Sequence, residues 1–185
     1  MNLRVRASDA ALVIVDIQDR LLPAMPAEML AEALRNVMRL AAIAKLLKLP
    51  VCVSEQYPKG LGHTIPALRE VLPSAEATYF TKSAFSLADE PTFASFLDHG
   101  RRTLIVAGME THVCVYQSVR DLAQRGYAVH VPADAVVSRT EGNRVVGLGL
   151  IERSGAVVTS TETVLFDLVE RAGTDDFRAL SRVVK

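Results

Sequence analysis

Short, continuously apolar runs alternate along the chain with longer stretches of helical periodicity, and this alternation limits the possible folds more than any other feature. Runs of strand length made up continuously of apolar or β-branched residues are typical of parallel sheets whose two faces are both covered. Six such runs are Leu12 to Val15, Val51 to Val53, Ala77 to Phe80, Thr103 to Ala107, Ala128 to Val131 and Ala156 to Thr159.

The stretches between the runs carry apolar residues at helical spacing. The expected helices are Glu28 to Lys48, Thr111 to Arg125, Asn143 to Ser154, Thr161 to Ala172 and a terminal docking helix, Asp175 to Val184. Strand and helix in alternation imply right-handed crossovers. We therefore predict an α/β fold: a doubly wound, six-stranded, mainly parallel sheet with helices on both faces, in three layers. In such folds ligands bind beyond the carboxyl ends of the strands.

Composition narrows the class of protein and its partners. The 185 residues suit a single domain over residues 1–185, and 21 basic against 21 acidic residues give a formal net charge of zero. A neutral chain has no overall field to attract a polyanion, so we expect neither nucleic acid nor membrane lipid as a partner.

Two cysteines cannot form a disulfide framework, and the first apolar run ends at Asp16, too early for a signal peptide or a membrane span. We expect a cytoplasmic protein.

Three residues with reactive side chains lie at or just after three predicted strands. Asp16, Lys82 and Cys114 each have an ordinary alternative: a strand-end polar residue, a solvated loop charge and a small core thiol, as we interpret Cys52. Cys114 differs from Cys52 because it lies in the first turn of a predicted helix, where backbone N–H groups and a nearby lysine favour a thiolate. An acid, a base and a nucleophile in one crevice indicate nucleophilic catalysis on a carbonyl, with the helix N–H groups as oxyanion hole.

Three segments around these residues occur together in a known family. They are ALVIVDIQDRLLPAM, YFTKSAFS and VAGMETHVCVYQSVRDL. In this order and at these separations the chain resembles, over most of its length, the isochorismatase-like cysteine hydrolases, a superfamily that also contains nicotinamidases and N-carbamoyl amidohydrolases. The segments SEQYPKGLGHTIPAL and GMETHVCV are most similar to the isochorismatase domain-containing hydrolase subgroup.

The resemblance implies a role for each residue of the site. Asp16 would accept the proton of Cys114, and Lys82 would hold the pair in its ionised form. The Cys114 sulfur would attack the substrate carbonyl, form a thioester and release it by hydrolysis. The backbone N–H groups of Cys114 and Glu110 would bind the oxyanion, and the Met109–Glu110 peptide bond would be cis.

The resemblance also bears on metals and on the substrate pocket. Nicotinamidases bind a divalent metal with an Asp-x-His motif and a second His, whereas the corresponding SEQYPKGLGH offers only Glu55 and His63. We therefore predict no metal and no cofactor. The loops just past the three segments supply four candidate pocket residues, for which ordinary loop packing is an equal alternative: Gln18, Tyr57, Phe85 and His112.

The favoured function is metal-independent hydrolysis of a small amide or related acyl compound. The alternatives are isochorismatase-type vinyl ether hydrolysis, which does not need the thiol, a non-catalytic binding module, and a thiol redox protein using Cys114. The redox alternative has no resolving cysteine near Cys114 in the sequence. We expect a small-molecule substrate and, by resemblance, a homo-oligomer.

Overall fold

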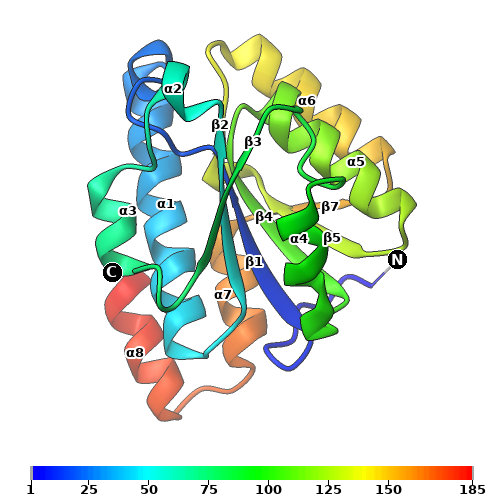
Figure 1. Cartoon of the computed structure of the whole chain (residues 1–185). Helices are drawn as coiled ribbons and strands as arrows, with labels where there is room; N and C mark the ends of the chain where they lie inside the picture. Colours follow the sequence, from blue (N-terminus) through cyan, green and yellow to red (C-terminus); the bar gives the residue numbers. More distant parts are fainter. Residues whose placement is uncertain (1, 185) are drawn as a thin grey trace.

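One parallel sheet forms the centre of the computed structural model, which describes residues 2–184 (Figure 1). The strand order is β3-β2-β1-β4-β5-β7, and each of these pairings is parallel. A seventh strand, β6 (Val136–Val137), pairs with β4 off this path. The other strands are β1 (Ala10–Val15), β2 (Val51–Gln56), β3 (Thr78–Lys82), β4 (Thr103–Met109), β5 (Ala128–Pro132) and β7 (Val157–Thr159).

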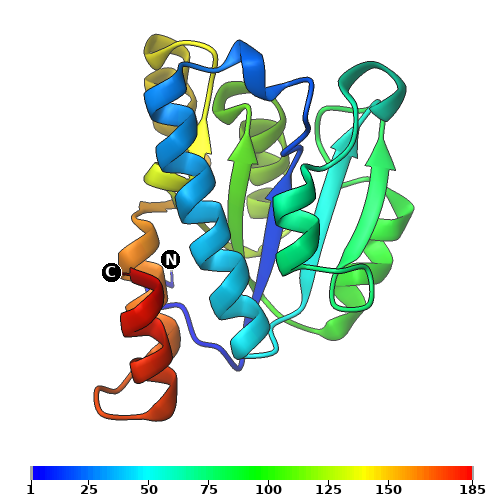
Figure 2. The ribbon, with the colours of Figure 1, turned by 90° about the vertical axis from the view of Figure 1, so that its left-hand side faces the viewer.

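Helices cover both faces of the sheet (Figures 1 and 2). One face packs against α1 (Ala27–Leu46), α3 (Pro66–Val71) and α7 (Thr161–Val169), and α8 (Asp175–Val184) packs against α1 and α7 on the same side. The other packs against α4 (Pro91–Phe96), α5 (Tyr116–Gln124) and α6 (Glu141–Arg153). The predicted doubly wound α/β architecture is therefore confirmed. None of the helices within residues 2–184 combines the length and the apolar character needed to cross a membrane.

The central strand β1 shows why the sequence selects this architecture. All six of its residues are buried. Leu12 and Ile14 belong to the core on the α1 side, whereas Val13 and Val15 belong to the core on the α5 side. Because successive side chains of a strand point to opposite faces, a strand that is apolar throughout requires cover on both.

Several elements escaped the sequence prediction because they are short. The helices α2 (Pro58–Leu61), α3 and α4 have four to six residues, and each begins with a proline in its first turn. The strand β6 has only two residues. Elements of this length are too short for the periodicity of a helix or the alternation of a strand to be recognised in the sequence. The helix predicted from Thr111 begins instead as a π-helical turn, η3 (Thr111–Val115), and the short 3₁₀ turns are η1 (Leu22–Ala24), η2 (Leu97–His99) and η4 (Ala133–Ala135).

The strand order reverses at β1, and this places the site. The first three strands run β1, β2, β3 toward one edge of the sheet, and β4 then pairs with the other side of β1. Side chains at the carboxyl ends of β1, β2, β3 and β4 therefore lie next to one another, at the type of switch point where α/β proteins bind ligands.

Apolar and polar contacts fasten the terminal helix α8 to the rest of the molecule. Leu180 is fully buried in the core on the α1 side. Arg39 of α1 donates from Nε to the carbonyl of Val183 (3.0 Å) and from Nη2 to that of Val184 (2.7 Å). The arginine satisfies carbonyls that the end of a helix leaves without intrahelical partners.

We predict that Leu180→Ala lowers the free energy of unfolding by roughly 2–5 kcal/mol, the cost of emptying a buried leucine site. Urea denaturation at neutral pH measures the change. The control is Arg182→Ala on the exposed side of the same helix, for which we expect a change within about 0.5 kcal/mol. Equal stability of the two variants would contradict the docking of α8.

Candidate active site

Asp16 follows β1 directly and is held in a left-handed backbone conformation, with φ of 51°. Its N–H donates to the carbonyl of Ser54 (3.2 Å), and the Ser54 hydroxyl donates to Asp16 Oδ1 (2.7 Å). Both contacts follow from the register of β1 and β2, which pairs Val15 with Ser54. The turn directs a fully buried carboxylate into the switch point.

Lys82 completes a buried ion pair with this carboxylate. It is the last residue of β3, not a loop residue, and is paired in register with Gln56. Its Nζ donates to Asp16 Oδ2 (2.8 Å), to Gln56 Oε1 (2.7 Å) and to the carbonyl of Phe85 (3.0 Å). Both charged side chains are inaccessible to solvent. A buried pair is tolerated when further hydrogen bonds satisfy the remaining polar atoms, as they do here.

Cys114 lies in η3, and its thiol is influenced by both members of the pair. Burial and, second, the negative charge of Asp16 raise the pKa of Cys114 to about 12, although Lys82 acts in the opposite direction. The raised pKa runs against the sequence-based expectation that the position of Cys114 favours the thiolate. In setting the pKa of this thiol, desolvation and the neighbouring carboxylate outweigh the effects of the lysine and of the nearby helix N-terminus. Asp16, Lys82 and Cys114, separated by up to 98 positions in the sequence, nevertheless converge at one point.

The backbone before Cys114 is unusual over three residues. Gly108 has φ of +121°, and a Cβ there would lie 2.1 Å from the carbonyl oxygen of Val15, so only glycine allows β4 to approach β1 this closely. The following Met109–Glu110 peptide bond is cis. The carbonyl of Glu110 then accepts from the N–H groups of Val113 (3.0 Å) and Val115 (3.2 Å), which closes the turn that carries Cys114.

Ser118 connects this turn to the segment that follows Lys82. Its hydroxyl donates to the carbonyl of Cys114 (2.6 Å) and accepts from the N–H of Leu87 (3.1 Å). The same segment supplies the Phe85 carbonyl that binds Lys82 Nζ. One buried hydroxyl thus ties the strand end that carries the lysine to the turn that carries the cysteine.

The four candidate pocket residues fall into two groups. Gln18 is fully buried, with Nε2 donating to the carbonyls of Gln56 (3.0 Å) and Gly62 (2.7 Å) and Oε1 accepting from Gln56 N–H (2.7 Å). Its amide therefore braces the loops beside the site. Tyr57 and Phe85 are 59% and 52% exposed, and His112 Nδ1 is in hydrogen-bond contact with Ser138 Oγ (3.1 Å).

Glu55 is surrounded by an arginine and further hydrogen-bonding groups from its own chain. Its two oxygens accept from the N–H of Thr64 (2.7 Å) and from Arg69 Nη2 (2.7 Å), and contact His63 Nδ1 (3.0 Å). Burial alone would raise the pKa of Glu55, but these donors lower it to about 2. Within residues 2–184, three or more His, Cys, Asp or Glu side chains nowhere gather closely enough to hold a metal ion.

Sequence reasoning missed the partners of the ion pair and of the turn that carries Cys114. Ser54, Gln56 and Ser118 bind Asp16, Lys82 and the Cys114 carbonyl respectively. A usable signal was present in β2: Ser54 and Gln56 are two positions apart, so they share one face of a strand that is buried throughout. Polar residues on a buried strand face require partners, and the carboxyl end of β2 is where they are found.

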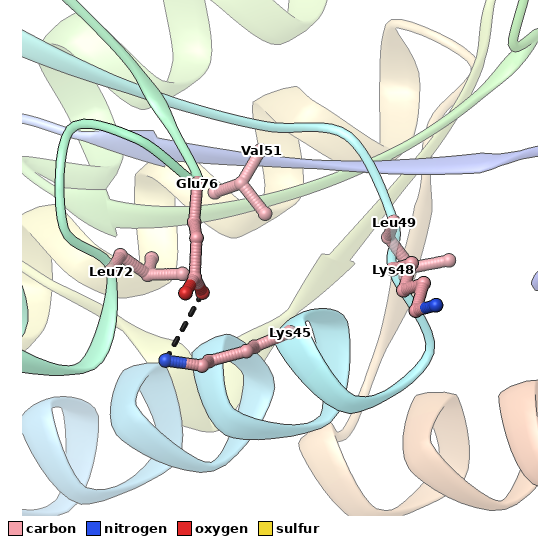
Figure 3. Close-up of a pocket in the computed structure, with 6 residues that line it drawn as sticks. All are labelled: Lys45, Lys48, Leu49, Val51, Leu72 and Glu76. Carbon is pink, nitrogen blue, oxygen red and sulfur yellow. Dashed lines mark ion pairs between the residues drawn. The ribbon is translucent and has the colours of Figure 1, made fainter.

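A separate hollow lies at the opposite end of the strands from Asp16 and Lys82 (Figure 3). The Lys45–Glu76 ion pair (3.1 Å) spans it. Val51 is the first residue of β2, so this hollow is at the amino ends of the strands, away from Asp16 and Lys82. The hollow measures about 380 Å³ and is lined by Lys45, Lys48, Leu49, Val51, Leu72 and Glu76.

The chain thus has a parallel α/β sheet whose switch point brings a carboxylate, an ammonium and a thiol together. Residues 10–163 match the isochorismatase domain family. The chain is 35% identical over 171 residues to isochorismatase domain-containing protein 1 of Danio rerio, covering 92% of this chain and 59% of that protein. The chain therefore spans somewhat more than half the length of this relative.

Solved structures agree with this match. The MAR1 ribonuclease of Caenorhabditis elegans superposes with a TM-score of 0.90 at 34% identity, covering 98% of this chain and 92% of that one. The YcaC gene product of Escherichia coli, described as an octameric hydrolase of unknown specificity, superposes with a TM-score of 0.89 at 25% identity, covering 99% and 91%. The chain belongs to the isochorismatase family, in the subgroup of isochorismatase domain-containing proteins.

The protonation state of Cys114 can be tested directly. With its pKa raised to about 12, the thiol should react with iodoacetamide at pH 7.5 more slowly than a free cysteine, whose pKa is about 8.5. Asp16→Asn removes the charge and the hydrogen bond that raise this pKa, so we expect faster alkylation at the same pH. Peptide mass spectrometry assigns the label to Cys114, and wild-type alkylation at the rate of a free thiol would contradict the prediction.

The cluster around Glu55 predicts a specific acid sensitivity. Because its pKa is lowered from 4.5 to about 2, its contribution to stability is complete above pH 4.5 and is lost as the pH falls toward 2. We expect about 2 kcal/mol to be lost between pH 5 and pH 3 in the wild type, and less in Glu55→Gln. Urea denaturation at both pH values measures this. Glu70→Gln, an exposed substitution on α3, should keep the wild-type loss.

Proposed function

We propose that this protein is a cysteine-dependent hydrolase of a small amide or related acyl compound, acting through a thioester on Cys114 without a metal. The convergence of the Asp16–Lys82 pair on the Cys114 thiol is the observation that carries this proposal. Membership of the isochorismatase family supports hydrolytic chemistry. The intact set of three reactive groups argues against a binding module that has lost its substrate.

In the first half-reaction the sulfur of Cys114 attacks the substrate carbonyl while its proton passes to Asp16. A carbon–sulfur bond forms, and the electron pair of the carbonyl moves to oxygen. The resulting oxyanion is bound by the backbone N–H groups of Glu110 and Cys114. Asp16 then donates the proton to the nitrogen and the carbon–nitrogen bond breaks. An amine or ammonia departs, and the acyl group remains on Cys114 as a thioester.

In the second half-reaction water replaces the amine. Asp16 removes a proton from the water as it attacks the thioester carbonyl. The tetrahedral intermediate collapses with cleavage of the carbon–sulfur bond, and the same proton returns to the sulfur. The products are a carboxylic acid and the original thiol, so no cofactor is consumed.

Lys82 makes the proton transfer feasible although the resting thiol has a high pKa. When the proton moves from Cys114 to Asp16, the negative charge moves from a carboxylate to a thiolate beside the same ammonium. One ion pair replaces another, and no isolated charge is created in the buried site. The carboxylate thus serves as general base only when a carbonyl is available to receive the sulfur.

The surroundings of the thiol support a small substrate. Cys114 is only 7% exposed, so the reacting carbonyl must be carried by a slim, planar group. We propose that Tyr57, Phe85 and His112 line its approach and that Gln18 acts as a brace for the loops. Aromatic and polar groups together suit a planar amide.

The same observations favour hydrolysis over the redox alternative. A protonated, buried thiol is a poor reductant of peroxide, because oxidation follows thiolate character and exposure. Cys52, the other cysteine, is fully buried in β2, and burial raises its pKa as well. It is therefore badly suited to act as a resolving partner.

We propose a homo-oligomer working in the cytoplasm, with the whole chain acting as one domain. The octameric state of the YcaC relative supports the assembly, and both cysteines are unpaired, as in a reducing compartment. One relative is named a ribonuclease. For this chain a net charge of zero argues against RNA as the substrate.

The proposal is tested by trapping the acyl-enzyme. Incubation with a panel of small primary amides, N-carbamoyl compounds, esters and vinyl ethers, followed by intact-mass measurement, should reveal an acyl adduct with at least one amide or ester. The adduct should be present in Cys52→Ala and absent in Cys114→Ala. Asp16→Asn should lower kcat by roughly 10²–10⁴-fold, because it lacks the general base. Turnover without a thiol, or of vinyl ethers alone, would overturn the proposal.

A further inference from the structure

The helix α6 touches η3 at a position that has no room for a side chain. A Cβ on Gly147 would lie 2.8 Å from the backbone nitrogen of His112, 2.9 Å from its Cα and 2.9 Å from the carbonyl carbon of Thr111. These atoms belong to the backbone of the turn and cannot rotate away. Gly147 is buried in the middle of α6, where glycine is a poor helix former.

The segment that leads into α6 contacts the same turn through two side chains. Ser138 Oγ is in hydrogen-bond contact with His112 Nδ1 (3.1 Å). Arg139 donates from its backbone N–H (3.1 Å) and from Nε (3.0 Å) to one carboxylate oxygen of Glu110. Together with Gly147, these contacts hold η3 at its start, in the residues between the β4 strand end and Cys114.

We infer that Gly147 is a positioning residue, whose missing side chain lets α6 hold η3 where the Cys114 sulfur and the backbone N–H groups of Glu110 and Cys114 face one reacting carbonyl. This inference rests on the proposed function. A methyl group at position 147 must displace the turn or the helix, because its nearest neighbours are backbone atoms. Displacement of the oxyanion donors weakens an interaction made in the transition state, which lowers kcat and leaves KM largely unchanged.

The same helix contains a matched control. Gly149 lies two positions further along α6, and a Cβ there would meet no atom within 4 Å. Gly149→Ala therefore makes the same chemical change in the same helix, with a better helix former and no contact with the turn.

The experiment compares Gly147→Ala, Gly149→Ala and wild type on the best substrate of the panel, and in iodoacetamide labelling of Cys114 at pH 7.5. For Gly147→Ala we expect kcat to fall at least tenfold with KM within twofold, and labelling to rise at least threefold because the displaced turn exposes the thiol. Gly149→Ala should stay within twofold of wild type in all three quantities. Wild-type values in Gly147→Ala, or equal changes in both variants, would overturn the inference.

A second variant covers the case in which Gly147→Ala does not fold. Ser138→Ala removes the contact with His112 without adding an atom, and we expect at least a threefold fall in kcat, unchanged KM and faster labelling. Unchanged values in a folded Ser138→Ala would overturn the inference. If wild type hydrolyses nothing in the panel, the proposed function is wrong. The labelling comparison between Gly147→Ala and Gly149→Ala then decides the positioning role by itself.

Discussion

The ion pair between Asp16 and Lys82 is the interaction on which the arrangement of the site depends. Neither charge could remain in the interior without the other, since removal of one partner leaves an uncompensated buried charge. Their 2.8 Å contact exists because β1 and β3 flank β2 in register, so that the strand ends fall side by side. The hydroxyl of Ser54 and the amide of Gln56, both from the intervening strand, fill the remaining hydrogen-bonding positions. The pairing of three strands is thus coupled to the placement of two charges.

The second requirement is a backbone that brings the thiol to this pair. Gly108 lets β4 pair with Val15 of β1 at a point where a Cβ would collide with the Val15 carbonyl, and the turn after it closes on the carbonyl of Glu110. Ser118 and the lead-in to α6 hold that turn from two directions. The chemistry proposed for Cys114 therefore draws on groups from both sides of the sheet's switch point, although the reactive atoms occupy a small volume.

Much of this could be predicted from the sequence, for physical reasons that also explain the failures. Strands such as β1 are apolar on both faces, so the covered parallel sheet follows directly, and the carboxyl ends of its strands indicate where to search for reactive residues. The protonation state of Cys114 could not be predicted in this way, because it depends on how deeply the thiol is buried and on the distance to Asp16. The bracing roles of Gln18 and Ser118 were equally hidden, since their partners are backbone atoms of segments remote in sequence.

The raised pKa of Cys114 has a consequence for the design of inhibitors. Covalent compounds that depend on a preformed sulfur anion find little of it here, however reactive their electrophile. Under the proposed mechanism, a compound succeeds only by presenting a carbonyl-like acceptor in the orientation that draws the proton toward Asp16. Selectivity for this protein over proteins with constitutively ionised cysteines would accordingly come from molecular fit rather than from intrinsic reactivity.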